Sequence, residues 1–325
     1  MKIAYIGGSW SSNIGNAFYN LGTGALFKQI AGIEAYFVPD PPQWKADTKN
    51  DFDFIAHLDV DLVLLTGPCL NLRLDKIFGA TFKALKARRV KIGFLSAGMS
   101  LYDEGEAKHV AAFLNEIQPS FIFTRDTQVI NFLKPKMKDA IFYDGLCASM
   151  FLNDAVTLPS LINKAHYYVY NFDKSNEPQL YYNNGDITIT TPKKSIFKSS
   201  TPLDETFNGL PIIRTNNNEI DLGYEELYKR KDTYHSDLPY GYLSLLKDAK
   251  TVFSERVHTC AATLILGGTA QYIPKSTRSF EKRSNIFERI GLSDIFNKPV
   301  SLDFNYLNKE KENMVKALKE VLAEL

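Results

Sequence analysis

Residues 251–273 read TVFSERVHTCAATLILGGTAQYI, and this stretch indicates the fold of the chain. The apolar run at Thr251–Phe253 is typical of a buried strand, and Val257–Leu266 carries apolar residues at helical spacing. Gly267-Gly268 ends the predicted helix, and Ala270–Ile273 follows as a second apolar run. A strand, a helix and a strand in this order predict a βαβ unit with a parallel sheet.

The rest of the chain shows the same alternation of short apolar runs and helical patterns. In the first half, the predicted strands are Lys2–Ile6, Ala35–Val38, Asp61–Leu65, Val90–Leu95, Phe121–Thr124 and Ala140–Tyr143, and the predicted helices include the segment through Leu26–Ile30, Asp75–Arg88 and Glu106–Ile117. The second half, from about Leu158, adds predicted strands at Ala165–Asn171 and Leu210–Thr215 and a predicted helix at Leu238–Ala249. The sequence therefore predicts two α/β units.

Two segments depart from this alternation. Residues 307–325 predict a charged amphipathic helix. The apolar side of that helix carries Val315, Leu318 and Val321. Residues 174–208 are polar and rich in turn residues, and Asn184-Gly185 is a hairpin signal. This second segment is either a surface excursion or a loop that touches the substrate, and the sequence leaves both open.

Composition narrows the class of protein. The length of 325 residues suggests two domains, and 45% hydrophobic with 23% charged residues is an ordinary globular mix. The 38 basic and 37 acidic residues give a net charge of +1, which argues against a nucleic-acid or membrane-surface binder.

Three widely spaced cysteines predict no disulfide framework, and the histidines lack metal-ligand spacing, so we expect no metal. Neither a signal peptide nor a membrane-spanning run is recognisable, and we expect a cytoplasmic protein.

Three segments could carry chemistry. The first is the loop that follows Lys2–Ile6 and runs from Gly7-Gly8 to Asn16. A glycine-rich turn between a strand and a helix exposes backbone N–H groups that bind anions. Its spacing matches neither the dinucleotide-binding motif nor the P-loop. The loop is either a tight turn or a ligand-binding loop at the carboxyl end of a parallel strand.

The second segment is Phe123-Thr124-Arg125-Asp126, which ends one predicted strand and opens a helix. The guanidinium fork of Arg125 can bind a carboxylate or a phosphate. Alternatively, Asp126 caps the helix and Arg125 pairs with it. Taken alone, these residues favour the cap.

The third segment, SERVH (Ser254–His258), is the most informative. The pattern starts a helix at Ser254 or Glu255 and leaves Arg256 and His258 in the first turn, off the buried stripe. Positive side chains there add to a helix N-terminus that is already positive, which costs free energy unless an anion is bound. A phosphate or carboxylate ligand would explain this, with His258 available for proton transfer. The alternative is a surface pair of Arg256 with Glu255 beside a structural histidine.

These segments resemble the polysaccharide pyruvyl transferase family. Four of them carry the resemblance, in the family's order: Ser12-Asn13-Ile14-Gly15-Asn16, Ser96-Ala97-Gly98, Thr124-Arg125-Asp126 and Phe253-Ser254-Glu255-Arg256-Val257-His258. The last is similar to the family's Ser-x-Arg-Leu-His helix and is the most specific of the four. The chain departs from the family at Thr66-Gly67-Pro68-Cys69, where the family often has three glycines, and at Val257, where it has leucine.

The resemblance implies a GT-B-like α/β fold, with two facing Rossmann-like domains and a cleft between them. Residues 1–157 would form the acceptor-side domain, residues 158–304 the donor-side domain, and residues 305–325 a helix that packs back on the first domain. The implied activity moves the pyruvate of phosphoenolpyruvate onto a sugar of a cell-surface polysaccharide or its lipid-linked precursor. The products are a ketal and phosphate. No cofactor is implied, and any membrane contact would be peripheral.

The resemblance also implies roles for individual residues. His258 would act as general acid/base, and Arg256 would stabilise the departing phosphate. The expected donor-binding residues are Arg125, Ser254, Lys275 and Lys282, and the expected acceptor-side residues are Asn13, Gly15, Asn16 and Gly67. Lys275 and Lys282 are alternative positions for the family's basic residue, and the sequence does not choose between them.

Two other functions fit the same sequence. One is a GT-B glycosyltransferase with a nucleotide-sugar donor, which needs a base-and-ribose pocket in the second domain. The stretch Gln271–Ser276, which follows the SERVH helix, is neutral or basic and offers no acidic group for a ribose. The other is a non-catalytic sugar-binding relative, against which the intact Arg256 and His258 argue.

Overall fold

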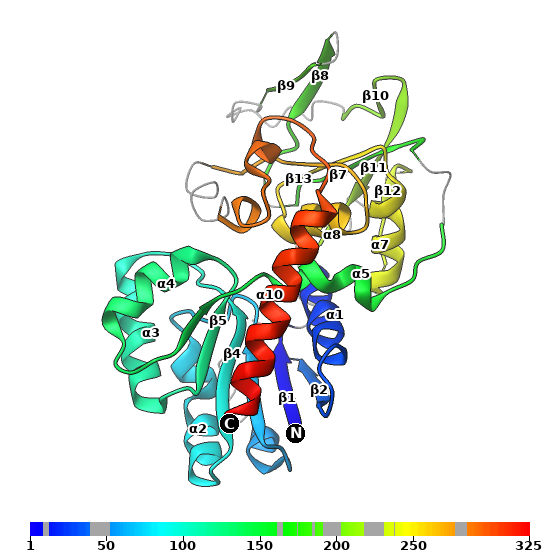
Figure 1. Ribbon diagram of the computed structural model, residues 1–325. Helices are drawn as coiled ribbons and strands as arrows, with labels where there is room; N and C mark the ends of the chain where they lie inside the picture. Colours follow the sequence, from blue (N-terminus) through cyan, green and yellow to red (C-terminus); the bar gives the residue numbers. More distant parts are fainter. Residues whose placement is uncertain are drawn as a thin grey trace. The chain divides into compact units, whose positions relative to one another are not determined.

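The computed structural model describes residues 1–8, 13–39, 53–160, 165–173, 175–183, 186–190, 203–217, 231–236, 238–276 and 285–325. The chain divides into two compact units, each with α/β architecture (Figure 1). Unit 1 comprises Met1–Val156, Glu281–Gly291 and Asp303–Leu325, and unit 2 comprises Thr157–Phe280 and Leu292–Leu302. The C-terminal part of the chain therefore contributes segments to both units.

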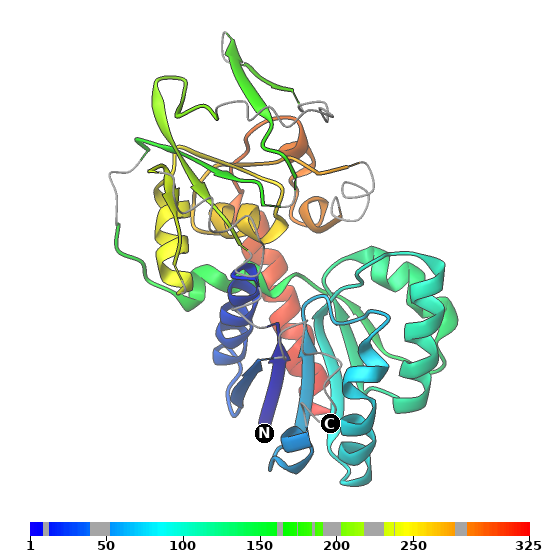
Figure 2. The same ribbon diagram turned by 180° about the vertical axis from the view of Figure 1, so that it is seen from behind.

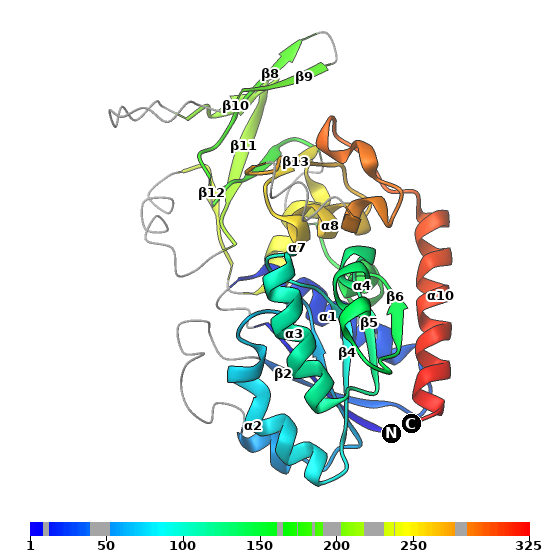
Figure 3. The same ribbon diagram turned by 90° about the vertical axis from the view of Figure 1, so that its left-hand side faces the viewer.

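Within the described residues, unit 1 is built on a six-stranded parallel sheet in the order β2-β1-β3-β4-β5-β6 (Figure 2). The strands are β1 (Lys2–Gly7), β2 (Glu34–Pro39), β3 (Leu62–Thr66), β4 (Lys91–Ala97), β5 (Phe121–Thr124) and β6 (Phe142–Asp144). The helices are α1 (Gly15–Lys28), α2 (Leu74–Ala87), α3 (Glu104–Ile117), α4 (Thr127–Leu133), α5 (Leu152–Ala155) and α10 (Phe304–Ala323), with 3-10 turns η2 (Asp53–His57), η3 (Lys134–Lys136) and η4 (Ala148–Phe151). Figure 3 shows α2 and α3 on one side of this sheet and α10 on the other.

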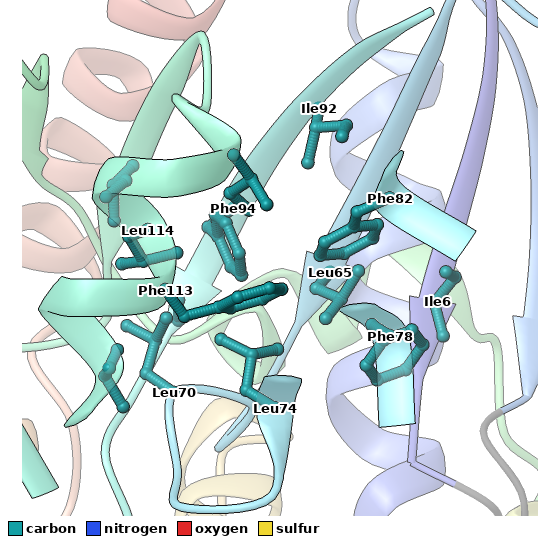
Figure 4. Close-up of a cluster of buried hydrophobic side chains, with 14 of the residues drawn as sticks. Ile6, Leu65, Leu70, Leu74, Phe78, Phe82, Ile92, Phe94, Phe113 and Leu114 are labelled. Carbon is teal, nitrogen blue, oxygen red and sulfur yellow. The ribbon is translucent and has the colours of Figure 1, made fainter. Parts of the chain in front are cut away.

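An aromatic layer holds α2 and α3 on the sheet of unit 1. The buried residues of α2 recur at helical spacing, so that Leu74, Phe78 and Phe82 face the same way. The ring of Phe82 lies 5.5 Å from that of Phe78 and 6.2 Å from that of Phe113 in α3, and both pairs are stacked (Figure 4). Phe94 of β4 meets Phe82 edge-on at 6.4 Å. Such ring pairs add to the free energy gained by burying apolar surface.

Unit 2 contains a second sheet, in the order β10-β11-β7-β13-β14, with β12 also paired to β11. The strands are β7 (Tyr168–Asn171), β10 (Thr206–Phe207), β11 (Leu210–Thr215), β12 (Thr233–Tyr234), β13 (Thr251–Ser254) and β14 (Ala270–Tyr272), and the helices are α7 (Pro239–Asp248) and α8 (Val257–Ile265), with a 3-10 turn η5 (Ser293–Phe296). All pairings except that of β10 with β11 are parallel. A hairpin of β8 (Gln179–Asn183) and β9 (Asp186–Thr190) extends from this unit (Figure 3).

The C-terminal helix α10 packs on unit 1 through the apolar side that the sequence predicts. Val315, Leu318 and Val321 are buried. The Nζ atom of Lys311 lies 2.5 Å from the carboxylate of Asp154 and 5.1 Å from the ring centre of Phe151. These contacts fasten the last helix to η4 and α5.

The strands and helices predicted from the sequence are confirmed, with ends that shift by a few residues. The hairpin predicted around Asn184-Gly185 is confirmed by the antiparallel pairing of β8 with β9, although these two residues lie outside the described ranges. The helix of the SERVH segment begins at Val257, as its apolar spacing predicts, and not at Ser254 or Glu255. In the described part of the chain, no helix is long and apolar enough to cross a membrane.

We expect Gly22→Ala to destabilise unit 1 by about 1–3 kcal/mol, because this helical glycine touches a neighbouring backbone. A Cβ atom at Gly22 would lie 1.9 Å from the carbonyl oxygen of Ala148, so α1 would have to move away from η4. Gly79→Ala is the matched control, since its Cβ would lie 3.8 Å from the ring of Phe113, and alanine there should stabilise α2 by about 0.5–1 kcal/mol. Urea unfolding of the two variants should shift in opposite directions, and equal shifts would show that the α1–η4 contact is looser than described.

Candidate functional site

The candidate site lies in unit 2, where the strand order of the sheet reverses. β7 is the first parallel strand of this unit, and the next two strands of its core, β11 and β13, lie on opposite sides of it. In open α/β sheets, ligands bind outside the carboxyl ends of the strands that flank such a reversal. β7 ends at Asn171 and β13 ends at Ser254, and Asp173 and Arg256 follow two residues later.

Arg256 is paired with Asp173 across this reversal. The Nε and Nη2 atoms of Arg256 donate to the two carboxylate oxygens of Asp173 over 2.5 and 2.7 Å, in a bidentate pair. The Asp173 side chain is 2% exposed and that of Arg256 is 10% exposed. Arg256 is the N-cap residue of α8, and its N–H donates to Oγ of Ser254. The sequence predicts a bound anion that compensates the charge of Arg256, whereas in the structure a buried carboxylate of the chain itself, Asp173, neutralises it.

Asn171 connects the polar groups behind this pair. Its buried Oδ1 accepts hydrogen bonds from the hydroxyls of Ser254 and Thr259 over 2.8 and 3.0 Å. Its Nδ2 donates to Oδ1 of Asn217 over 3.1 Å, and the N–H of Asn217 donates to Asp173 over 3.0 Å. The ends of β7, β11 and β13 and the start of α8 thus share one buried network. A satisfied network of this kind holds its members in one geometry.

Glu255 contacts the same loop after β7 but not Arg256. Its carboxylate accepts hydrogen bonds from the N–H and the Oγ of Ser175 over 3.0 and 2.6 Å. The alternative of a surface pair between Arg256 and Glu255 is therefore wrong. Instead, two consecutive residues of the SERVH segment hold the loop after β7 at two points, Asp173 and Ser175.

The other residues predicted for the donor side take different positions. His258 is half-buried in the first turn of α8, as the sequence predicts. Ser254 is fully buried within the network, so it supports the site from behind. Lys275 is exposed and follows β14, whose carboxyl end lies beside that of β13. The sheet therefore brings Arg256, His258 and Lys275 to one edge, whereas Lys282 lies outside the described residues.

Cys260 lies in α8 behind this edge and is buried. Burial raises the pKa of its thiol far above the usual value, so the sulfur stays protonated near neutral pH. Its Sγ contacts the carbonyl oxygens of Ser254 and Gln271 at 3.9 and 3.7 Å. Over the ranges that the structure describes, no group of three or more histidine, cysteine or acidic residues could hold a metal ion.

Unit 1 has a matching reversal between β1 and β3. The residues predicted for the acceptor side and placed around it are Asn13, Gly15, Asn16 and Gly67. The N–H of Gly8, at the end of β1, donates to the hydroxyl of Tyr19 over 2.8 Å, and Gly67 packs against the same ring. Oδ1 of Asn13 accepts from the N–H of Gly15 over 2.9 Å at the start of α1. A tyrosine from α1 thus occupies part of the space at this reversal, and Ser9–Ser12 lie outside the described residues.

Arg125, at the end of β5, has a side chain only 1% exposed. Its Nε and Nη2 donate to the hydroxyl of Tyr102 over 3.3 and 3.0 Å, and the carboxylate of Asp126 lies 3.5 Å away. Burial alone lowers the pKa of Arg125, but Tyr102 and Asp126 outweigh this effect and raise the pKa overall. Asp126 also accepts from the N–H of Val129, so the helix cap predicted from the sequence is confirmed. A Cβ on Gly98 would lie 2.1 Å from Nε of Arg125, so this glycine makes room for the guanidinium, which is closed to solvent in this arrangement.

Sequence reasoning missed Asp173 and Asn171. Both lie at the end of the predicted strand Ala165–Asn171, as Ser254 and Arg256 lie at the end of another. Their position at the end of a predicted parallel strand was the only sign in the sequence that they could belong to a site. This position could not show that the strand ending at Asn171 and the strand before Ser254 are neighbours in the sheet.

The two sheets, parallel except for the edge strand β10 of unit 2, define the class of fold as α/β of the GT-B type, with two Rossmann-like domains. The expected cleft between the domains stays a prediction. No protein-family model matches the chain, and no curated protein matches its sequence. The comparison with solved structures, in contrast, finds proteins of similar fold along the whole chain.

Three of these structures are UDP-N-acetylglucosamine 2-epimerases or a candidate for one. The candidate, from Listeria monocytogenes, is 13% identical, with a TM-score of 0.54 over 100% of this chain and 97% of that chain. The enzyme from Neisseria meningitidis, bound to UDP-GlcNAc, is 12% identical, with a TM-score of 0.53 over 98% of this chain and 100% of that chain. The enzyme from Rickettsia bellii is 12% identical, with a TM-score of 0.53 over 100% of this chain and 96% of that chain. At these identities the similarity establishes the fold.

Proposed function

We propose that this protein is a transferase that moves the pyruvyl group of phosphoenolpyruvate onto two hydroxyls of a saccharide, with release of phosphate. The observation that carries the proposal is the position of Arg256, His258 and Lys275 at one edge of the unit 2 sheet. Phosphoenolpyruvate has a phosphate and a carboxylate, which suit a guanidinium, an ammonium group and a helix N-terminus. The resemblance of the SERVH segment to the pyruvyl transferase family supports the same donor.

The Nη1 atom of Arg256 is the part of this side chain that remains for such an anion. Asp173 takes the Nε and Nη2 atoms, and no hydrogen bond or ion pair of Nη1 is formed among the described residues. No side chain caps α8, and its first turn contains no acidic residue. The N–H groups of this turn therefore add a partial positive charge beside Nη1.

His258 moves the protons in this proposal. One sugar hydroxyl adds to C2 of phosphoenolpyruvate while the methylene carbon C3 gains a proton and becomes a methyl group. The second hydroxyl then displaces phosphate from C2, and its proton ends on the leaving phosphate. The two hydroxyl protons account for both steps, so one imidazole can accept and return them. Arg256 and Lys275 would stabilise the phosphate as it leaves.

A second function, an enzyme acting on a sugar nucleotide, is favoured by the fold. The Neisseria meningitidis structure with this fold was solved with UDP-GlcNAc bound. In that case the edge of unit 2 would hold a diphosphate in place of phosphoenolpyruvate. We prefer phosphoenolpyruvate because the described residues after β14, Ile273–Ser276, include no acidic side chain to bind a ribose.

We expect phosphate release when the protein is incubated with phosphoenolpyruvate and a panel of nitrophenyl and lipid-linked saccharides. The phosphate formed should equal the saccharide consumed, because each ketal releases one phosphate. Omission of the saccharide is the control. If no saccharide supports release, and if UDP-GlcNAc but not phosphoenolpyruvate raises the Tm, the second function is the correct one.

A further inference from the structure

We infer that Asp173 is a positioning residue: it fixes the guanidinium of Arg256 with Nη1 as the edge left for an anion, and it weakens the hold of the site on free phosphate. The inference deepens the proposed function and rests on it for the identity of the donor. The geometry that carries it is the bidentate pair at the strand-order reversal of unit 2.

Asp173 is itself held in place, which allows it to orient Arg256. Its Oδ2 accepts the N–H of Asn217 over 3.0 Å in addition to Nη2 of Arg256, and its side chain is 2% exposed. The next anchor along the chain is Ser175, which Glu255 binds. Because Asn217 also holds the Asp173 carboxylate, this carboxylate cannot turn together with the guanidinium of Arg256. The bidentate pair therefore keeps the guanidinium in one plane.

The same carboxylate sets the charge of the site. A paired guanidinium and carboxylate carry no net charge, so the attraction of Arg256 for an anion at Nη1 is reduced by the repulsion from Asp173, which lies at the opposite edge of the guanidinium. The remaining attraction comes from the start of α8 and from Lys275, which is exposed and therefore screened by solvent. A site of this kind binds free phosphate weakly, which suits a reaction that must release phosphate in every turnover.

Asp173→Asn tests both parts of the inference in the full-length protein. Asparagine has nearly the same shape, but it lacks the charge and can accept on only one side of the fork. Titration with inorganic phosphate should show binding at least about tenfold tighter than in the wild type, because a nearby negative charge is gone. With phosphoenolpyruvate and a saccharide, kcat should fall by about 10²-fold, because Arg256 is no longer aligned. A role confined to stability would not tighten phosphate binding.

Two further variants complete the test. Glu255→Gln removes the other carboxylate that contacts the loop after β7 but leaves Arg256 paired with Asp173. The affinity for phosphate should therefore change by less than about threefold. Asp173→Glu keeps the charge but displaces the fork, so it should lower kcat without tightening phosphate binding. If Asp173→Asn does not fold, Asp173→Glu decides the question. Unchanged or weaker phosphate binding in a folded Asp173→Asn variant, or tighter binding in Asp173→Glu, overturns the inference.

The phosphate titration also separates this inference from the proposed function. If phosphoenolpyruvate neither binds nor reacts while Asp173→Asn binds phosphate more tightly than the wild type, the donor is wrong but the role of Asp173 stands. If phosphoenolpyruvate reacts and Asp173→Asn leaves both phosphate affinity and kcat unchanged, the donor stands and the role of Asp173 fails.

Discussion

His258→Ala should lower turnover with phosphoenolpyruvate by about 10²–10⁴-fold, the range typical of a lost general acid or base. The imidazole is half-buried in the first turn of α8, at the edge of the sheet where Arg256 and Lys275 follow neighbouring strands. Because Arg256 remains paired with Asp173 in this variant, the proposed anion site should keep its shape. Calorimetric titration should therefore show that phosphoenolpyruvate still binds with an affinity close to that of the wild type.

His166→Ala is the matched control for this experiment. His166 belongs to the same unit but is exposed and lies before β7, at the opposite end of the strand from Asp173. Its replacement should leave both kcat and donor affinity unchanged. Full turnover in His258→Ala would remove the histidine from the mechanism, and loss of donor binding would assign it to binding instead of proton transfer.

Arg214→Met should destabilise unit 2 by about 3–5 kcal/mol, because it removes a buried positive charge from two partly buried carboxylates. Nε and Nη2 of Arg214 donate to the carboxylate of Glu177 over 2.7 and 2.6 Å, and Nη1 donates to Asp232. The carbonyl oxygen of Asp204 accepts a further hydrogen bond over 2.7 Å. One buried guanidinium on β11 therefore ties down three loops around the sheet. Methionine fills a similar volume but satisfies none of these acceptors.

Urea unfolding, followed by circular dichroism and by hydrogen exchange of the β7 and β11 amides, would measure this loss and place it in unit 2. Lys298→Met is the control, because the pair of Lys298 with Asp294 is exposed at both ends and should contribute less than about 1 kcal/mol. Comparable losses in the two variants would mean that burial does not strengthen the contacts of Arg214.

The fold could be predicted from the sequence wherever a local pattern determines the structure. The apolar spacing of α2 and α10 reflects one buried face, and the continuous apolar runs of β3 and β13 reflect strands buried on both faces. Neighbouring residues encode both patterns. The apolar spacing of α8 predicts its start at Val257, but local pattern could not exclude an earlier start at Ser254 or Glu255. Oγ of Ser254 bonds to Asn171, 83 positions earlier, and this contact holds Ser254 at the strand end while the helix begins at Val257.

The candidate site could be predicted only in part, for the same reason. Arg256 and His258 are found from the sequence because they share one strand-to-helix junction. Asp173 is 83 positions from Arg256, and the strand order that joins them is not a local property. Similarly, the burial of Arg125 depends on Gly98 and Tyr102 from a neighbouring strand and its loop. The local sequence pattern therefore identifies candidate site residues, whereas the order and packing of the strands determine whether a ligand can reach them.

The most direct test of the proposed donor is a calorimetric titration of the wild-type protein and of Arg256→Ala with phosphoenolpyruvate, each repeated in the presence of UDP-GlcNAc. We predict that phosphoenolpyruvate binds the wild type at one site per chain, that Arg256→Ala weakens this binding by at least about tenfold, and that UDP-GlcNAc does not compete. Binding of UDP-GlcNAc without binding of phosphoenolpyruvate, or donor binding that does not depend on Arg256, would contradict the account.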